Sequence, residues 1–361
     1  MNFTFRRVSF LLLAGMAFMF VTLTGCLQPL KGQPQVTNVA ADLPIVTKTV
    51  ESAVDKDKLE GVAVLLMKDN RVIYEKSFGR YNLNTVVPIA SASKLLASST
   101  IMTLVDEGKL ALDAPISKYM SNLTGEEANI TLRQLLSHTS GLPGQHRCLS
   151  NNSITLEECA DQILERGLRT EPGTDFSYGG VSYQVAGRIA EIASGKSWKS
   201  LFEERIQRPL NMTNTNYEAS LNPRIAGGAS STLQDYTNLL QMHINSGVFN
   251  SKRILSTQAV TEMQRDQTRG LPIRISPHKD GRRYGLGLWR DIVDNQGRVI
   301  QLSCQGAFGF SPWIDRQRNL IGVFLVRSRW RTIVPVVEQL QKNVRDMVDS
   351  KQASVKPPSI S

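Results

Sequence analysis

The stretch PIASASKLLASSTIMTLVDEGKL, residues 88–110, holds a serine three positions before a lysine at the start of a helical pattern. Apolar residues recur there with the spacing of one helix face: Leu95, Leu96, Ile101, Met102, Leu104 and Val105. If the helix begins near Ser91, then Ser91 and Lys94 lie on the same face, one turn apart. Because a serine hydroxyl is a weak nucleophile without an adjacent base, this pair is a candidate nucleophile and base.

The spacing of Ser91 and Lys94 does not by itself establish catalysis. Serine is a favoured N-cap residue, so Ser91 could instead cap the helix. The same spacing occurs in Ser276-Pro277-His278-Lys279, within a polar, turn-like segment that no helix follows, and we discount that copy. Lysine also needs a lowered pKa to act as a base, which burial and a helix N-terminus favour. No G-x-S-x-G or H-E-x-x-H motif offers another catalytic centre.

Strand patterns occupy both ends of the chain and helical patterns its middle. Residues 61–79 predict a β-hairpin, because two apolar, β-rich runs flank the turn signal Lys68-Asp69-Asn70. Helix-length stretches follow as far as about residue 275: 156–166, 183–193, 198–206, 231–245 and 257–264. The last part of the chain predicts four strands and one helix: 284–291, 298–304, 311–315, 320–326 and then 334–348.

This order predicts an α/β (α+β) fold. An antiparallel sheet flanked by helices is built from both chain ends, and a helical region is inserted between them. One domain is expected over residues 46–350. Within it, residues 46–109 and 276–350 form the α/β part, and residues 110–275 form the mainly helical part.

Eight short segments resemble, in their order along the chain, those of the serine β-lactamase-like family: IASASKLLAS, GKLALDAPISKYM, ITLRQLLSHTSGLPG, EPGTDFSYGGVSYQVAGRIAE, RPLNMTNT, AGGASSTLQDYTNLLQM, YGLGLW and GAFGFSPWID. That family includes class C β-lactamases, penicillin-binding D-alanyl carboxypeptidases, D-aminopeptidases and esterases. The resemblance covers about residues 46–330 and implies a β-lactamase/transpeptidase-like fold. It is specific for family and fold but not for substrate.

The resemblance carries three catalytic residues over to this sequence. It implies that Ser91 is the acylated nucleophile, Lys94 its general base, and Tyr178 the proton-relaying tyrosine of the Y-x-N motif. A phenol can exchange protons near neutral pH if neighbouring cations lower its pKa. The alternative for Tyr178 is a buried aromatic with a satisfied hydroxyl. Gly180 stands where the motif has asparagine, so the amide that would contact substrate or Lys94 is missing.

The third motif of the family, K-T-G or H-x-G, corresponds here to Cys304-Gln305-Gly306. We expect these residues and Gly180 to border the substrate. The resemblance implies an oxyanion hole made by the backbone N–H groups of Ser91 and Ala307, which does not depend on side chains. A neutral thiol cannot make the charge-assisted bond that a lysine makes with a carboxylate. The thiol therefore predicts a preference for neutral acyl substrates, unless it is a small buried apolar filler.

Residues 1–25 predict an export signal, because a basic start precedes an apolar run too short for a membrane span and then LTGC. LTGC resembles the lipobox of bacterial lipoproteins. That resemblance implies cleavage before Cys26, lipid on its thiol and attachment to a membrane. Leu27 after the cysteine implies the outer membrane, with the protein facing the periplasm. We expect residues 26–45 to form a tether and residues 351–361 a disordered tail.

Cys148 and Cys159 are eleven residues apart in a polar loop that leads into a helix. In an oxidising compartment this favours a disulfide over a metal site, since the 4 histidines offer no spaced partner set. His138 could belong to a catalytic triad, but its segment SHTSG resembles a structural turn of the family and Lys94 already fills the role of base, which favours a structural role for His138. The formal charge of +10 is scattered along the chain, so no nucleic-acid partner is expected. No metal or organic cofactor is implied.

These features predict a cell-envelope serine hydrolase that acts through a Ser91 acyl-enzyme on small esters or amides. The expected partner is a small-molecule or peptidoglycan-derived acyl substrate, and the oligomeric state is left open. Two alternatives stay open. One is β-lactamase or D-alanyl carboxypeptidase-like activity, and the other is a non-catalytic binding protein that lost turnover through Gly180 and Cys304.

Overall fold

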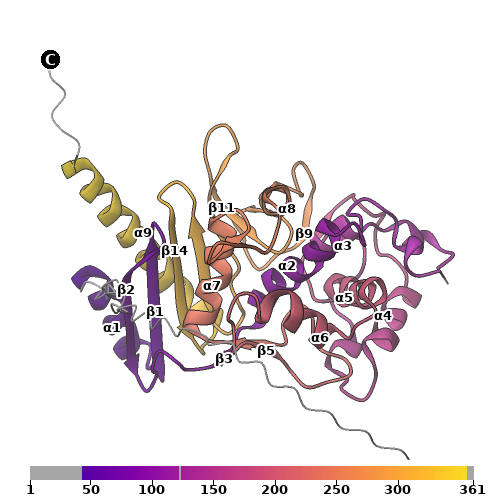
Figure 1. The fold of residues 1–361 in the computed structure, drawn as a ribbon, viewed down its shortest axis with the longest axis horizontal. Helices are drawn as coiled ribbons and strands as arrows, with labels where there is room; N and C mark the ends of the chain where they lie inside the picture. Colours follow the sequence, from indigo (N-terminus) through magenta and orange to yellow (C-terminus); the bar gives the residue numbers. More distant parts are fainter. Residues whose placement is uncertain (1–42, 122, 356–361) are drawn as a thin grey trace, which may run out of the picture. The chain divides into compact units, whose positions relative to one another are not determined.

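The computed structural model describes residues 43–121 and 123–355. Its largest sheet has seven antiparallel strands in the order β10-β11-β12-β13-β14-β1-β2 (Figure 1). β1 (Gly61–Lys68) pairs with β2 (Arg71–Gly79) on one side and with β14 (Leu320–Val326) on the other. The other strands are β10 (Arg283–Tyr284), β11 (Trp289–Val293), β12 (Val299–Ser303) and β13 (Ser311–Asp315). The sheet is therefore built from both ends of the described chain, which confirms the predicted fold class.

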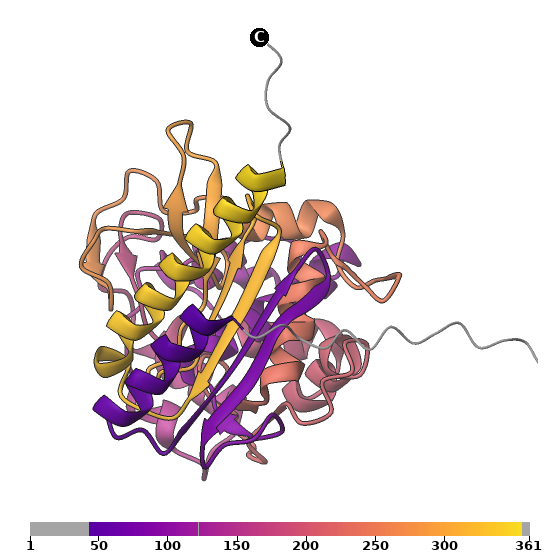
Figure 2. The same ribbon diagram turned by 90° about the vertical axis from the view of Figure 1, so that its left-hand side faces the viewer.

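Two helices from opposite ends of the described chain cover one face of this sheet. α1 (Pro44–Lys56) and α9 (Trp330–Val355) lie side by side across the strands in Figure 2. Alternate residues of β1 pack against these two helices: Val62, Val64 and Leu66. The intervening residues of β1 belong to the larger core on the other face of the sheet: Ala63, Leu65 and Met67. Because successive strand side chains point to opposite faces, burial of both faces explains the unbroken apolar run of β1.

The region between the two parts of the sheet is mainly helical. Its helices are α2 (Ser93–Asp106), α3 (Leu132–Leu136), α4 (Leu156–Glu165), α5 (Val181–Ser194), α6 (Trp198–Phe202), α7 (Leu233–Ile244) and α8 (Thr257–Gln264). A π-helical turn, Glu203–Gln207, continues α6, so the predicted helix 198–206 is α-helical only in its first half. Short 3₁₀ turns cover Ala90–Ala92, Ile116–Lys118, Glu126–Asn129 and Arg147–Ser150. α7 packs against β14 and β1 on the second face of the sheet.

Three small sheets hold the loops of this region. β3 (Val87–Pro88) and β5 (Asn216–Tyr217) flank β6 (Ala229–Ser231), β4 (Phe176–Ser177) runs parallel to β9 (Ile273–Ile275), and β7 (Val248–Phe249) pairs with β8 (Lys252–Arg253). Two of these short strands position candidate catalytic residues. β3 leads directly into the turn that contains Ser91, and β4 ends immediately before Tyr178.

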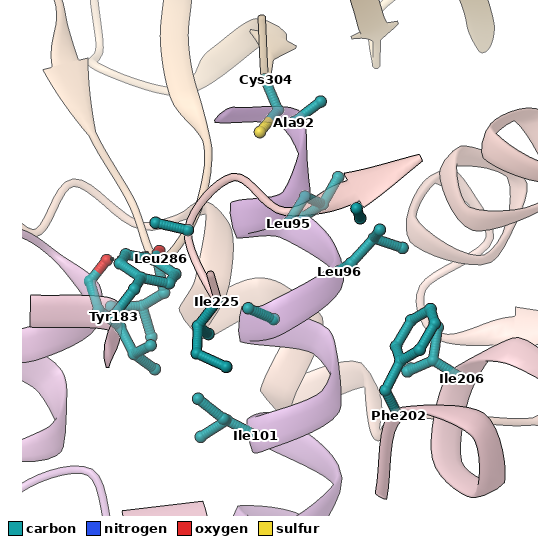
Figure 3. Close-up of a cluster of buried hydrophobic side chains, with 14 of the residues drawn as sticks. Ala92, Leu95, Leu96, Ile101, Tyr183, Phe202, Ile206, Ile225, Leu286 and Cys304 are labelled. Atoms are coloured by element: carbon teal, nitrogen blue, oxygen red, sulfur yellow. Dashed lines mark hydrogen bonds between the residues drawn. The ribbon is translucent and has the colours of Figure 1, made fainter. Parts of the chain in front are cut away.

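α2 is buried on every side, whereas its sequence predicted a single apolar face. Every residue from Ser93 to Leu104 is buried. Figure 3 shows side chains from several elements around it: Tyr183, Phe202, Ile206, Ile225 and Leu286. Its polar groups find internal partners, as where Ser99 hydrogen-bonds His243 at 2.9 Å. A helix through the middle of a core needs no polar face, provided that its polar side chains are satisfied.

Other elements also differ from the sequence-based prediction. The predicted strand 284–291 is interrupted between β10 and β11, where Gly287 has φ +90°. A Cβ at Gly287 would lie 2.9 Å from the Lys94 carbonyl oxygen, so glycine lets this turn approach α2 closely. α1 was not predicted at all. α9 extends beyond the predicted 334–348 and includes the first residues of the stretch expected to be a tail.

The predicted export signal, Cys26 and residues 26–42 of the predicted tether lie outside the described residues, as do residues 356–361. Within the described ranges, no helix is both long and apolar enough to cross a membrane.

Candidate active site

Ser91 lies in the 3₁₀ turn Ala90–Ala92 that precedes α2. The turn is tight, because Ala90 has φ +44°, a backbone conformation that costs energy for any residue with a Cβ. Ser91 makes no side-chain capping bond to the helix; instead its Oγ accepts a hydrogen bond from Lys94 Nζ at 3.2 Å. The geometry thus pairs the serine with the lysine and leaves the helix without a serine cap.

Lys94 is only 3% exposed and has a second hydrogen-bond acceptor, the Ala226 carbonyl oxygen, at 3.2 Å. Burial lowers its pKa to about 8, and the charge of Arg224 adds to this shift. A lysine with this pKa is partly uncharged in mildly alkaline solution and can accept the Ser91 proton.

Tyr178 completes the cluster expected from the sequence. Its ring lies 4.6 Å from Lys94 Nζ and 5.1 Å from the ring of Trp289. Burial raises the pKa of Tyr178, and a hydrogen bond with the Ser91 side chain acts in the opposite direction. The sequence-based expectation that neighbouring cations bring this pKa toward neutrality is not met. Desolvation dominates instead, so the phenol stays protonated and can donate a hydrogen bond.

Cys304-Gln305-Gly306 follows β12 and lies against the Ser91 turn. A Cβ at Gly306 would lie 2.2 Å from the Ile89 carbonyl oxygen, so only glycine permits this approach. The N–H of Ala307 has no hydrogen-bond partner among residues 43–121 and 123–355, and its carbonyl accepts from the Trp330 N–H at 3.1 Å. A free amide next to the nucleophile is what an oxyanion hole requires.

Cys304 itself does not line the cleft. Its side chain is 3% exposed, and its thiol approaches the Ser91 carbonyl oxygen at 3.4 Å. Burial raises the pKa of this thiol to about 11, so it is neutral. The expectation of neutral substrates assumed that position 304 faces the substrate, and the structure does not place the thiol there.

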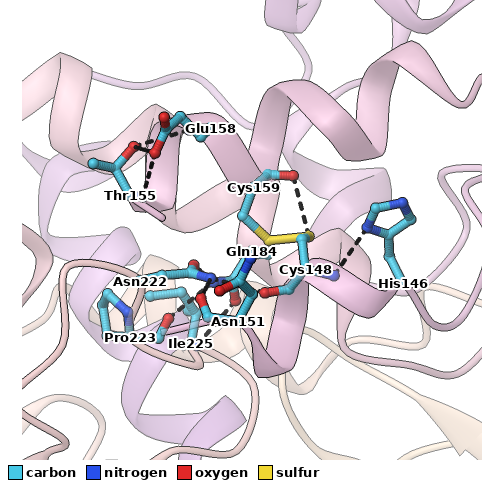
Figure 4. Close-up of a disulfide and its surroundings, with 10 residues drawn as sticks. All are labelled: His146, Cys148, Asn151, Thr155, Glu158, Cys159, Gln184, Asn222, Pro223 and Ile225. Atoms are coloured by element: carbon cyan, nitrogen blue, oxygen red, sulfur yellow. Dashed lines mark hydrogen bonds between the residues drawn. A yellow bond between two sulfur atoms is a disulfide. The ribbon is translucent and has the colours of Figure 1, made fainter. Parts of the chain in front are cut away.

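Gly180 lies at the start of α5, two residues after Tyr178. A Cβ at this position would meet Leu149 Cδ1 at 3.0 Å. Leu149 belongs to the loop that the Cys148–Cys159 disulfide closes (Figure 4). The structure thus contains the predicted disulfide, and its loop fills the space beside Gly180.

A cleft of about 890 Å³ opens onto Ser91, Tyr178 and Gln305–Ala307. Residues that the sequence did not single out for this site complete its lining, among them the aromatics Trp289 and Trp330 and the cations Lys279, Arg329 and Arg331. None of these three cations forms an ion pair within the described ranges. The run VRSRWR after β14 was the available sequence signal.

Two histidines lie near this site. His278 lines the cleft edge-on to Trp289, with ring centroids 4.5 Å apart, and burial lowers its pKa to about 4. It comes from the discounted S-x-x-K copy, and no helix begins there. His138 is buried behind Tyr178, with ring centroids 4.6 Å apart, and has φ +62°. Burial lowers its pKa well below the usual value, so it is neutral.

Curated relatives are similar to this chain over different lengths. This chain is 28% identical over 311 residues to the D-alanyl-D-alanine-carboxypeptidase/endopeptidase AmpH of Escherichia coli (strain K12), covering 74% of this chain and 79% of AmpH. It is 27% identical over 192 residues to Protein flp of Staphylococcus aureus (strain N315), covering 49% of this chain. That match spans only 39% of flp.

Solved structures share the fold. A protein from Bacteroides dorei DSM 17855, assigned to the beta-lactamases, has a TM-score of 0.77 and 32% identity, covering 85% of this chain and 99% of that one. EstCE1, described as a hydrolase with promiscuous acyltransferase activity, has a TM-score of 0.72 at 20% identity over 83% of this chain and 97% of its own. The family model for Beta-lactamase matches residues 46–331, a range that includes the Ser91–Lys94 pair, Tyr178 and Ala307. This chain therefore belongs to the beta-lactamase family of serine hydrolases.

Proposed function

We propose that this protein is a cell-envelope hydrolase that cleaves small esters or amides through an acyl-enzyme on Ser91. The observation that carries the proposal is the 3.2 Å contact between Ser91 Oγ and Lys94 Nζ, with the lysine pKa lowered to about 8. A base with a pKa near the working pH is what proton abstraction from a serine requires.

In the proposed reaction, uncharged Lys94 takes the Ser91 hydroxyl proton as Oγ attacks the substrate carbonyl carbon. The N–H groups of Ser91 and Ala307 stabilise the negative oxygen of the tetrahedral intermediate. The intermediate collapses when the leaving group departs with a proton, which Lys94 supplies through the protonated Tyr178. Water then attacks the acyl-enzyme, releases the acid and restores the serine hydroxyl.

A fluorophosphonate probe tests the nucleophile. We expect stoichiometric labelling of the wild type, none of Ser91→Ala, and normal labelling of the control Ser350→Ala on α9. Esterase turnover should fall by about three orders of magnitude or more in Ser91→Ala, because catalytic groups act as a unit. An unlabelled wild-type protein would instead support the non-catalytic alternative.

The charged residues that line the cleft favour a substrate that carries a negative charge. Four cations line it, Lys279, Arg282, Arg329 and Arg331, against two carboxylates, Asp280 and Glu338. Arg282 pairs with Asp280, so the lining keeps an excess of positive charge, and the thiol of Cys304 is buried beneath it. The hydrogen bond from the Trp330 N–H to the Ala307 carbonyl holds the backbone between the two arginines next to the proposed oxyanion hole. Charge-assisted bonds from arginine to a carboxylate are about twice as strong as neutral ones. We therefore propose a preference for anionic substrates in place of the preference for neutral substrates that the sequence predicted. It also keeps D-alanyl carboxypeptidase-like activity as the second candidate, since such peptides end in a carboxylate and AmpH is a relative.

Two p-nitrophenyl esters of equal length, butyrate and succinate, test the charge preference. We expect kcat/KM to favour the succinate ester in the wild type. The double variant Arg329→Gln/Arg331→Gln should lower that ratio by about fivefold or more. Lys342→Gln, which removes one positive charge from an exposed turn of α9 away from the cleft, should leave it unchanged. A wild type that prefers butyrate would restore the sequence-based expectation.

We also propose that lipid on Cys26 anchors the protein to the outer membrane, facing the periplasm. The support is the lipobox-like LTGC after an apolar run. Cys26→Ser should abolish labelling by radioactive palmitate and leave the protein unprocessed or in the soluble periplasmic fraction. Palmitate label that persists in Cys26→Ser would exclude this anchor.

A further inference from the structure

We propose that Gln184 and Asn222 position the base Lys94, and that the disulfide-bridged loop Cys148–Cys159 anchors both of them. The inference rests on the proposed function, since it assigns a role in placing its base. Gly180, two residues after Tyr178, has no side chain that could reach Lys94, and Leu149 occupies the adjacent space.

Lys94 therefore has few hydrogen-bond partners that could hold its Nζ in place. Within the described ranges its Nζ has two hydrogen-bond acceptors, Ser91 Oγ and the Ala226 carbonyl oxygen. The first is the nucleophile itself, whose bonding changes during the reaction. The Ala226 carbonyl is the acceptor that stays in place, so its position decides where the ammonium or amine group lies relative to Ser91.

Gln184 fixes the segment that carries this carbonyl. Its Oε1 accepts from the Ile225 N–H at 3.2 Å, one residue before Ala226. Its Nε2 donates to Asn222 Oδ1 at 2.7 Å and to the Pro223 carbonyl at 2.9 Å. One side chain on α5 thus holds three points of the segment 222–226 (Figure 4).

Asn222 ties this segment to the disulfide loop. Its Nδ2 donates to the Cys148 carbonyl at 2.8 Å and to the Asn151 carbonyl at 2.9 Å. Cys148 is bonded through its sulfur to Cys159 on α4. Figure 4 shows the two amide side chains side by side next to the disulfide. A continuous path of covalent and hydrogen bonds therefore runs from the disulfide to the acceptor of Lys94.

The side-chain amides of Gln184 and Asn222 are buried, so loss of one of their hydrogen bonds is not compensated by water. Gln184 and Asn222 are each 1% exposed, and every donor and acceptor of both side chains has a partner. A fully satisfied buried network specifies one arrangement, whereas losing one member leaves unpaired groups that move or admit water. Loss of this network should therefore displace Ala226 and, through it, Lys94.

The test compares Gln184→Met, which keeps size and removes the hydrogen bonds, with the control Gln258→Met on the exposed side of α8. In Gln184→Met we expect kcat to fall about tenfold or more with KM changed less than about twofold, since only the base is displaced. The acidic limb of the pH–kcat/KM profile should also move away from that of the wild type. Loss of the carbonyl acceptor by itself moves it downward, because that bond favours charged Lys94. Gln184→Glu, which keeps an acceptor for the Ile225 N–H, should recover part of the loss.

Reduction of the disulfide supplies a second measurement that needs no substitution in the network. Treatment of the folded wild type with a phosphine reductant should lower kcat and slow fluorophosphonate labelling of Ser91. It should have little further effect on Gln184→Met, because both changes break the same path. Circular dichroism shows whether each sample stays folded.

The outcomes separate this inference from the proposed function. If the wild type does not label with fluorophosphonate, the proposed function fails. If the wild type labels, and Gln184→Met labels at the same rate with an unchanged pH profile, the hydrolase stands and the positioning role of Gln184 is wrong. A folded Gln184→Met whose kcat falls while its pH profile stays that of the wild type would equally overturn it.

Discussion

At the scale of single residues, the proposed chemistry depends on a lysine held away from water. Lys94 is 3% exposed and lies over the ring of Tyr178, where no carboxylate pairs with it among the described residues. Burial of an ammonium group without an anionic partner favours its uncharged form. The environment that lowers the pKa of Lys94, as the proposed base requires, therefore also makes its charged form costly to the folded state.

The pH dependence of activity follows from this pKa. Since only uncharged Lys94 can accept the Ser91 proton, kcat/KM for a neutral ester should rise with pH through about 8 and then level off. The measurement is a pH–rate profile over the range in which the protein stays folded. A profile that is flat from pH 6.5 to 9.5 would contradict Lys94 as the base.

Lys94→Met should stabilise the protein while abolishing turnover. The pKa of Lys94 in the folded protein, about 8, lies below the ordinary lysine value of 10.5, so the buried charge costs stability fully below about pH 8. The cost disappears as the pH rises toward 10.5. By linkage it amounts to up to about 3 kcal/mol, since each tenfold change in the ionisation equilibrium is worth about 1.4 kcal/mol.

Urea unfolding at pH 7 and at pH 10 measures this effect. We expect the gain in Lys94→Met to be large at pH 7 and small at pH 10. An equal gain at both values would point to better packing by the methionine rather than to removal of a charge.

At the scale of elements, the site is made where two turns meet. One is the turn Ala90–Ala92 between β3 and α2, and the other follows β12 and contains Gly306. The backbone of Ala90 is left-handed, which lowers the stability of the folded state locally. The backbone of Gly306 also approaches the Ile89 carbonyl closely, which restricts this position to glycine. They bring the Ala307 amide toward Ser91, although neither residue lies in a regular part of the large sheet.

Gly306→Ala should therefore separate the two turns. Its Cβ would meet the Ile89 carbonyl oxygen at 2.2 Å, so one backbone must move. Removal of one oxyanion donor costs about 10²–10³ in kcat, and we expect a loss of that order. The measurement is kcat for a neutral ester together with the free energy of unfolding.

Gly297→Ala is the control for Gly306→Ala. Gly297 has φ +76° in an open turn, and a Cβ there would meet nothing within 4 Å. This substitution should cost about 1 kcal/mol of stability through its backbone and leave kcat unchanged. If Gly306→Ala keeps full activity, Ala307 is not part of the oxyanion hole.

At the scale of the whole molecule, the large sheet cannot be completed until nearly all of the chain is present. β14 pairs with both β1 and β13. The pairing of residues 62–68 therefore cannot form until residues 320–326 are present. α1 and α9 then cover the same face. Pairings this far apart in sequence must form against a large loop entropy, and without them strand edges are left open.

A chain that stops after residue 319 should consequently fail to fold. It retains Ser91, Lys94 and Tyr178 but lacks β14 and α9. We expect rapid proteolysis and no fluorophosphonate labelling, whereas a chain that stops after Ser350 should behave as the full-length protein. Protease resistance of the shorter chain would show that the helical region is stable by itself.

Much of this structure could be predicted because short-range patterns encode it. β13, β14 and α8 begin and end where the sequence placed them, since apolar periodicity and turn residues act within a few positions. The capping box of Thr155 similarly starts α4. The spacing of Ser91 and Lys94 also sufficed to put both side chains together, because residues three apart are neighbours at a helix start.

Only the tertiary structure decided which groups face the cleft. Cys304 is buried beneath Ser91, Arg329 and Arg331 line the cleft at the start of α9, and Leu149 takes the space beside Gly180. Likewise α2 lost its expected polar face because α5, α6 and α8 all pack against it. Local sequence sets the periodicity of an element, but the direction of each side chain relative to distant elements depends on long-range packing.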